Sequence, residues 1–441
     1  MNGRFSTTEM ESVLSVSALV CSMVDFEAAL SRVQSSIGII PEEIGVAITA
    51  ACQNVKIPAE KLEILAPNSG TLAAPFLAEL IAQVSEQNAD AASYLHFGTT
   101  SQDLIDTASV LSLREAGKLL EAEMKALATA LSELAKEHSN TVMLGRTMLQ
   151  PSPQVTFGLK VAHWYGAISR AITRLQEANK HALTLQFGGV VGTLSAFGKA
   201  GIEIAEALGS ELGLTVPPAP WHTQRDNLVE LASAVGILAG SLGKIAIDIV
   251  LMMQFEVQEV SEPMLAGRGG SSAVPHKQNP VGCLVALSAS RKVPGLVSTM
   301  MNSMVQEHER AVGAWQAEWP TLVDIYSNTA ASLTAMKDVI EGLNVYPDQM
   351  LDNIKNTQGL TYSEAVSVAL TLKVGRSDAR RLTEVASRLA IESDTSFEQI
   401  ILNSYDILNV INRDELTELF KQKGNLGVSQ EFISRILNNR Y

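Results

Sequence analysis

The chain has 441 residues, of which 46% are hydrophobic and only 5% aromatic. This length allows two or three domains with a large core, and the composition favours alanine- and leucine-rich helices over a β-sandwich or barrel. The formal net charge of −14 argues against nucleic acid or an anionic membrane as a partner. Cys21, Cys52 and Cys283 are odd in number and lack metal-ligand spacing, so we expect reduced, buried thiols in a cytoplasmic protein.

Residues 1–105 are predicted to form an N-terminal domain of shorter helices. The segment from Val13 to Val24 is apolar enough to resemble a signal core, but two glutamates precede it, so no export signal is predicted. The domain ends with His96-Phe-Gly-Thr-Thr-Ser-Gln-Asp103, a helix-start pattern ahead of an apolar run. Thr100 and Ser101 can serve as helix caps, or they can hold a substrate carboxylate at the positive helix end, and the two interpretations are compatible.

Residues 106–350 are predicted to form a central bundle of long helices, followed by a C-terminal helical domain over residues 351–441. Apolar residues recur at alternating steps of three and four, which predicts helices that pack against one another. None of the apolar runs reaches the roughly 18 uncharged residues that a membrane span needs. Small residues at Gly236, Gly240 and Gly243 would let a second helix approach closely. The predicted helices cover Leu113–Leu134, Phe157–Leu175, Leu228–Met252, and 281 to about 310 with a bend at Pro294.

Two further polar blocks lie between these helices. Gly145-Arg-Thr-Met-Leu-Gln150 places Arg146 and Gln150 just before a helix, although Arg146 could equally pair with one of the many acidic residues. Gly269-Gly-Ser-Ser-Ala-Val-Pro-His-Lys-Gln-Asn-Pro280 is a glycine-rich loop that runs into a helix start, with Asn279 as the expected cap. A loop over residues 267–280 that carries Ser271 and Lys277 toward an anion-friendly helix end is typical of a catalytic lid.

Together, the three blocks resemble the signature of the fumarase/aspartase superfamily, and the resemblance spans roughly residues 15 to 440. It implies an all-α, three-domain fold with a central long-helix bundle, assembled as a homotetramer in which three subunits share each site. It also implies removal of a group β to a carboxylate, or the reverse addition, without a metal or an organic cofactor.

The resemblance implies a role for each matching residue. Ser271 carries over as the group that moves the proton α to a carboxylate, with Lys277 beside it, whereas Ser272 carries over only as loop structure. A serine hydroxyl is a poor base unless its alkoxide is stabilised, which gives Lys277 and the loop amides a physical task. The implied substrate ligands are His96, Thr100, Ser101, Gln102, Arg146, Gln150, Arg225, Asn279 and Arg310. The roles of His96, His222 and His308 in the chemistry stay open.

Met148 departs from the superfamily pattern, because several members have a histidine here that assists the leaving group. A thioether cannot transfer a proton, but a carboxylate, whose conjugate acid has a pKa near ~4, can leave or attack without such help. The segments Pro220–Asp226 and Glu307–Trp319 further resemble a superfamily member that closes a tricarboxylic diene into a lactone. The expected partner is therefore a small tricarboxylate.

Two alternatives remain. Adenylosuccinate lyase, or a related lyase, is disfavoured because Pro67-Asn-Ser-Gly70 and Val312-Gly-Ala-Trp315 replace what a nucleotide monophosphate needs. A helical scaffold that has lost its chemistry is the alternative of another class. Trp221, Trp315 and Trp319 could shape a dry pocket or simply fill the core.

Overall fold

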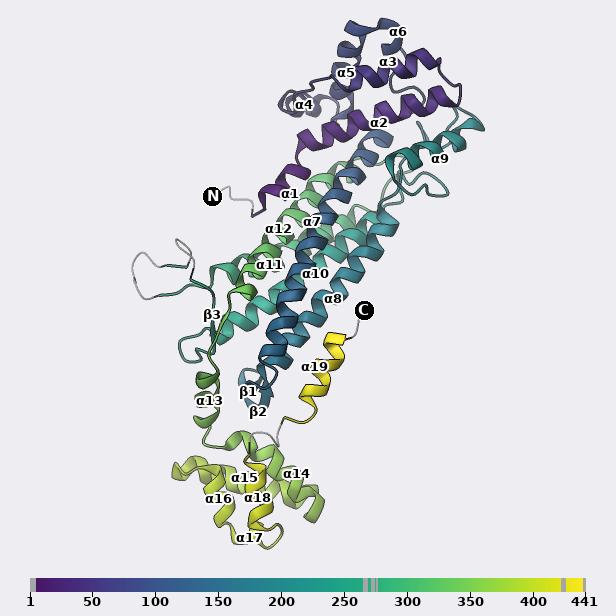
Figure 1. Ribbon diagram of the computed structural model, residues 1–441. Helices are drawn as coiled ribbons and strands as arrows, with labels where there is room; N and C mark the ends of the chain where they lie inside the picture. The colour runs from purple at the N-terminus through teal and green to yellow at the C-terminus, as the bar shows by residue number, and fades with distance from the viewer. Residues whose placement is uncertain (1–4, 265–268, 271–273, 275–276, 422–425, 439–441) are drawn as a thin grey trace. The chain divides into compact units, whose positions relative to one another are not determined.

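The computed structural model describes residues 5–264, 269–270, 274, 277–421 and 426–438, and it is mostly helical, as predicted (Figure 1). The N-terminal helices are α1 (Thr8–Val13), α2 (Val16–Ser36), α3 (Glu42–Cys52), α4 (Ala59–Leu65), η1 (Ala66–Asn68), α5 (Ala73–Gln87) and α6 (Ala89–Ala92). The middle of the chain forms α7 (Ser101–Glu137), α8 (Phe157–Ala182), α9 (Ala200–Leu212), α10 (Asp226–Met252), α11 (Val281–Asn302) and α12 (Ala314–Glu341). The last part forms α13 (Pro347–Lys355), η2 (Leu360–Tyr362), α14 (Ser363–Val374), α15 (Arg376–Ser393), α16 (Phe397–Asn403), α17 (Tyr405–Leu408), α18 (Arg413–Leu419) and α19 (Ser429–Asn438).

The chain contacts divide the molecule into two compact units. Unit 1 comprises residues 1–125, 171–243 and 285–335, and unit 2 comprises residues 126–170, 244–284 and 336–441. Each unit draws on three separate stretches of chain, whereas the expected domain limits at residues 105 and 350 follow chain order. Those limits therefore stay predictions.

The long helices predicted from the apolar stripes are present. The stripe of α7 is buried through Leu113, Leu120 and Met124, and that of α10 through Leu231 and Leu238. In unit 1, α10 and α11 approach so closely that a Cβ on Gly236 would lie 2.7 Å from Val297 Cγ2. A Cβ on Gly243 would likewise collide with Ser290, whereas one on Gly240 would have nothing within 4 Å. The close helix approach predicted from the sequence is therefore present at Gly236 and Gly243 but not at Gly240. The helix α11 contains Pro294 but ends at Asn302, which corrects the predicted end near residue 310.

Among the described helices, α10 alone is long and apolar enough by composition to cross a membrane, and half of its apolar window is buried inside the protein. A core helix of a bundle passes the same test. Cys52 and Cys283 are buried, as expected, but Cys21 is exposed, which corrects the expectation that all three thiols are buried. Its position on α2 places it on the solvent side of an otherwise well-buried helix.

Unit 2 contains short antiparallel strands that the sequence did not reveal. The strands β1 (Val142–Thr147) and β2 (Gln150–Thr156) form a hairpin, and α13 packs on β1. Two further short strands, β3 (Val260–Ser261) and β4 (Asn344–Val345), pair with each other. The helices α14–α18 gather around their own apolar core, which includes Leu370, Leu382, Phe397, Ile401 and Leu416.

Candidate active site

In unit 1, the start of α7 is organised by the buried carboxylate of Asp103. Its two oxygens accept hydrogen bonds from the backbone amides of Gly188 and Gly189 (3.0 and 2.8 Å) and from Thr99 Oγ1 (3.1 Å). The carboxylate also lies 2.6 Å from His222 Nε2. Asp103 therefore joins three segments, rather than only completing a capping pattern with Thr100.

Arg310 binds the same backbone stretch, Gly188-Gly189, as Asp103. Its Nη2 donates to the carbonyl of Gly189 at 2.7 Å, so Asp103 and Arg310 bind successive polar groups of one backbone stretch. Burial lowers the pKa of Arg310, while the charges of Asp103 and Asp106 oppose that shift. Arg310 and Asp103, which lies on the same helix turn as Ser101, thus bind the same glycine of the 188–189 stretch.

The two candidate hydroxyls at the helix start are partly buried, and within the described ranges neither Thr100 nor Ser101 has a side-chain hydrogen bond. Gln102 differs, because its Nε2 donates to Asp106 (3.1 Å) and to the carbonyl of His222 (2.8 Å). The amide of Gln102 is thus largely committed to holding the site together. Thr100 and Ser101 are the groups that remain available for a ligand.

A buried ion-pair network lies one turn further along α7. The guanidinium of Arg225 contacts Asp106 through two bonds (2.7 and 3.0 Å) and contacts Glu318 on its other edge. Burial alone would raise the pKa of Asp106, but the charge and hydrogen bonds of Arg225 outweigh it, so that pKa is lowered. For Glu318 burial prevails over Arg225 and raises the pKa. Arg225 is only 2% exposed, so its visible role is to neutralise these carboxylates.

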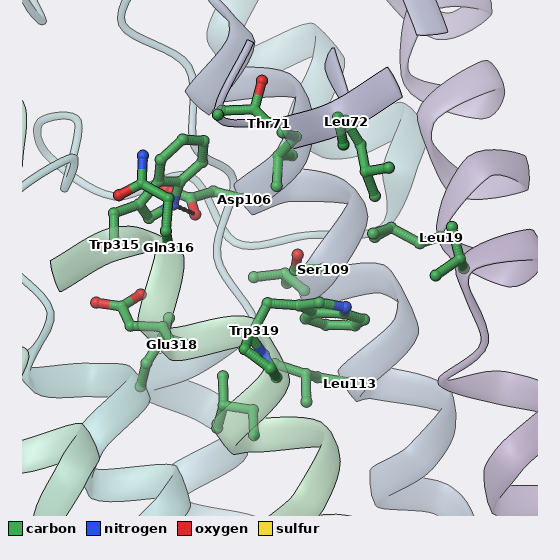
Figure 2. Close-up of a pocket in the computed structure, with 18 of the residues that line it drawn as sticks. Leu19, Thr71, Leu72, Asp106, Ser109, Leu113, Trp315, Gln316, Glu318 and Trp319 are labelled. Carbon is green, nitrogen blue, oxygen red and sulfur yellow. Dashed lines mark hydrogen bonds between the residues drawn. The ribbon is translucent and has the colours of Figure 1, made fainter. Parts of the chain in front are cut away.

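A cavity of about 440 Å³ adjoins this network in unit 1 (Figure 2). Its walls are mainly aliphatic, with the rings of Trp315 and Trp319 from α12, and three acidic residues face one arginine. Trp221 is not among the lining residues, because its ring lies under the Arg225 guanidinium, 4.5 Å from ring centroid to Cζ. Two of the three tryptophans therefore shape a pocket, and the third belongs to the core. The balance of charge makes the cavity unsuitable for a polyanion.

In unit 2, the β1–β2 hairpin carries the second block of candidate residues. Arg146 forms a two-point contact with the buried carboxylate of Glu259 (2.8 and 2.9 Å), so the acidic partner considered in the sequence analysis exists. Gln150 is exposed at the start of β2. The turn between the strands consists of Met148 and Leu149, both with positive φ (50° and 66°) and 97% and 73% exposed.

A turn of this kind normally contains asparagine and glycine, because other residues are strained at positive φ. Met148 and Leu149 thus present two apolar side chains to solvent at a backbone cost. The side chain at position 148 offers no group able to transfer a proton. Met148, the residue that departs from the superfamily pattern, is thus almost fully exposed at the hairpin tip.

The signature loop is described only in part. Ser271, the predicted catalytic serine, lies outside the described residues. Lys277 is exposed, and the backbone amide of Asn279 donates to the carbonyl of Gly269 at 2.8 Å, which closes the loop. The amides at the start of α11 are taken by Glu262, which accepts from Gly282 and Cys283 (3.0 and 2.8 Å).

The cap of α11 is therefore a distant carboxylate and not the neighbouring Asn279, which corrects the sequence-based expectation. A carboxylate can compete with a local asparagine because it interacts with the positive helix end as well as with the amides. A substrate anion consequently does not find these two amides free. In the part of the chain that the structure describes, no three His, Cys, Asp or Glu side chains converge as metal ligands.

Comparison with known proteins assigns the chain to a family. Residues 5–295 match the family model described as Lyase, and residues 359–436 match the model described as Adenylosuccinate lyase C-terminus. The chain belongs to this lyase family, within the fumarase/aspartase superfamily. The predicted family and the all-α fold class are thereby confirmed.

Individual relatives are similar to the chain over nearly its whole length. The chain is 42% identical over 418 residues to a 3-carboxy-cis,cis-muconate cycloisomerase of Bradyrhizobium diazoefficiens, which covers 95% of this chain and 93% of the relative. It is 41% identical to the enzyme of the same name from Pseudomonas aeruginosa, over 98% of this chain and 94% of the relative. The crystal structure of 3-carboxy-cis,cis-muconate lactonizing enzyme from Pseudomonas putida superposes with a TM-score of 0.91 at 40% identity, covering 98% and 97% of the two chains.

Proposed function

We propose that the protein is a cofactor-free cycloisomerase that converts 3-carboxy-cis,cis-muconate into 4-carboxymuconolactone, a step of the protocatechuate branch of the β-ketoadipate pathway. The observation that carries this proposal is Met148 at the exposed hairpin tip. A family member without an acid at this place suits a reaction whose moving group is already a stable anion. The relatives that share 41–42% identity with the chain bear the name of such an enzyme.

The proposed chemistry balances without any added reactant. One substrate carboxylate adds through oxygen to the carbon that bears the 3-carboxyl group, and the electron pair of the double bond moves to the neighbouring carbon. That carbon, α to another carboxylate, takes a proton from Ser271, and solvent later restores the serine hydroxyl. Lys277 and the loop amides stabilise the electron-rich intermediate.

The remaining candidates hold the three substrate carboxylates. We assign this task to His96, Thr100, Ser101, Gln150, Asn279, Arg146 and Arg310. Gln102 and Arg225 stay predicted ligands, although their side chains already bind Asp106. Arg310 adds local positive charge to a chain of net charge −14, whereas the charge of Arg146 is balanced by Glu259. Because the family resemblance implies that three subunits share each site, we infer a homotetramer in the cytoplasm. The exposed apolar turn at Met148 and Leu149 is consistent with a surface that another subunit covers.

Adenylosuccinate lyase is the second candidate, favoured by the family match over residues 359–436. The two segments that depart from the adenylosuccinate lyase pattern argue against it. Their residues Pro67, Gly70 and Trp315 line the cavity in unit 1. A phosphate there would meet indole rings and carboxylates, and the cavity's one arginine is already paired. Charge and polarity thus oppose a nucleotide monophosphate in this cavity, and for the same reason we do not place the tricarboxylate in it.

The proposal predicts that a histidine at position 148 brings no benefit. We expect Met148→His to form lactone from 3-carboxy-cis,cis-muconate no faster than the wild type, because a carboxylate needs no proton donor to move. Histidine is among the side chains that tolerate positive φ, so the turn should fold. The measurement is the steady-state kcat for lactone formation.

Leu149→His is the matched control, since it adds the same ring at the adjacent exposed turn position. Equal or lower rates in both variants support the proposal. A several-fold gain in kcat for Met148→His, without a gain for Leu149→His, would show that acid assistance limits the natural enzyme and would overturn it.

A further inference from the structure

A second carboxylate–imidazole pair lies in unit 1, formed by Glu27 of α2 and His96. Glu27 is 0% exposed, and its Oε1 lies 2.6 Å from His96 Nδ1. Its Oε2 accepts a hydrogen bond from the backbone amide of His96 at 3.1 Å. Among the described residues, His96 is the one ion-pair partner of Glu27. A buried carboxylate needs such compensation, so the pair is tightly specified.

The backbone of His96 is held in a conformation that a free loop would avoid. Its φ is 58°, in the left-handed region, which is uncommon for a non-glycine residue even though histidine tolerates it better than most. Glu27 binds the amide of this residue, and Gln34, seven residues further along α2, donates to the carbonyl of Phe97 at 2.9 Å. One face of α2 thus fixes both the loop and the ring.

The contact also determines which ring nitrogen is free. An ionised carboxylate only accepts hydrogen bonds, so Nδ1 carries the hydrogen in the contact with Glu27. Within the described part of the chain, Nε2 of His96 has no hydrogen-bond partner. The side chain of His96 is 16% exposed while that of Glu27 is fully covered, so the outer edge of the ring is the part that a ligand can reach.

The carboxylate–imidazole pair of Asp103 and His222 provides a comparison in which both side chains are enclosed. Its distance is also 2.6 Å, but the ring of His222 is only 5% exposed, and Asp103 accepts three further hydrogen bonds. His222 is therefore enclosed within a network that fastens a loop. His96 differs because, of the residues that the structure describes, its ring bonds only to Glu27, through Nδ1, while the edge that carries Nε2 is partly exposed.

We propose that Glu27 is a positioning residue, which holds the imidazole of His96 with Nε2 directed to a carboxylate of the substrate. This inference rests on the proposed function for the identity of that substrate. The arrangement follows the way in which a carboxylate behind a histidine fixes its ring orientation and tautomer. When Nε2 also carries a hydrogen, the ring becomes a cation that Glu27 balances, and it can donate to the substrate carboxylate.

A double-mutant cycle tests this coupling. Wild type, Glu27→Gln, His96→Ala and the double variant are compared by calorimetric binding of tricarballylate, a saturated tricarboxylate that cannot cyclise, and by kcat/KM for lactone formation. We expect Glu27→Gln to weaken tricarballylate binding about tenfold, by analogy with the lower end of what a carboxylate behind a metal-ligating histidine contributes. The double variant should bind no more weakly than His96→Ala, because Glu27 acts through the ring.

Gln34→Ala is the matched control, since it removes a buried polar contact from the same helix to the same loop without touching the imidazole. Its effect should be the same with and without His96. If Glu27→Gln instead costs a further tenfold in the His96→Ala background, Glu27 acts independently of the ring and the inference is wrong. If Glu27→Gln does not fold, the cycle is run with Glu27→Asp, which keeps the charge but shortens the reach. A coupled loss of tricarballylate binding in a protein that makes no lactone would refute the proposed function and leave this inference standing.

Discussion

Replacement of Ser271 by alanine is expected to lower kcat for lactone formation by about a thousandfold, within the range by which a positioned proton donor accelerates a reaction. The reason is that the carbon α to the substrate carboxylate must receive a proton as the ring closes. We expect the neighbouring hydroxyl of Ser272 not to replace that of Ser271, because only a correctly positioned donor can reach this carbon. The assignment comes from the sequence, because Ser271 lies outside the described residues. The measurement is kcat together with the oligomeric state of the variant.

Ser272→Ala provides the control, because it removes a hydroxyl from the same loop at a position to which we assign no chemical role. Its kcat should stay within a few-fold of the wild type, and both variants should remain folded. A Ser271→Ala enzyme that retains more than a tenth of the wild-type kcat would remove Ser271 from the mechanism. A wild-type protein without any turnover would favour the helical scaffold instead.

Replacement of Arg225 by alanine is expected to destabilise the protein by about 3–5 kcal/mol, the usual cost of removing one partner from a buried ion pair. The variant leaves Asp106 and Glu318 facing each other without the guanidinium that contacts both. Burial already raises the pKa of Glu318, so loss of the arginine should make its ionised form still less favourable. The measurement is the shift of the urea-induced unfolding transition.

The matched control is Arg32→Ala, which removes an arginine that pairs with Glu211 at the surface, where both side chains are partly exposed. An exposed pair contributes about 0–1 kcal/mol, so this variant should unfold close to the wild type. If Arg225→Ala is as stable as Arg32→Ala but binds tricarballylate much more weakly, then Arg225 is a substrate ligand, as the sequence resemblance implies. The structural role given to the network would then be wrong.

The helical framework could be predicted because its signal is repeated along the chain. The stripe from Leu113 to Leu134 and the seam from Leu228 to Met252 each place many apolar residues on one side of a helix. The β1–β2 hairpin could not be predicted in the same way. Its turn is Met148-Leu149, which lacks the asparagine and glycine that identify such turns. The strain that makes this turn unusual is visible only in the backbone angles.

The candidate site was predictable in its cations and hydroxyls but not in their partners. Arg146 lies in a motif block, whereas Glu259, the acid that binds it, lies in another part of the chain. Arg225 and Glu318 both lie in segments that carry the family resemblance, but nothing in the sequence pairs them. Glu262 likewise takes the start of α11 in place of the adjacent Asn279. Such pairs depend on which distant segments meet in the fold, and a single sequence with 47 acidic residues does not identify them.

The claim on which the account depends is that the moving group is a carboxylate of the substrate itself. The most direct measurement presents the purified wild-type protein with 3-carboxy-cis,cis-muconate and with adenylosuccinate in parallel, and follows lactone formation and fumarate release. We expect rapid loss of the conjugated diene with formation of the lactone, and no fumarate. Release of fumarate from adenylosuccinate, with the diene tricarboxylate left unchanged, would contradict it.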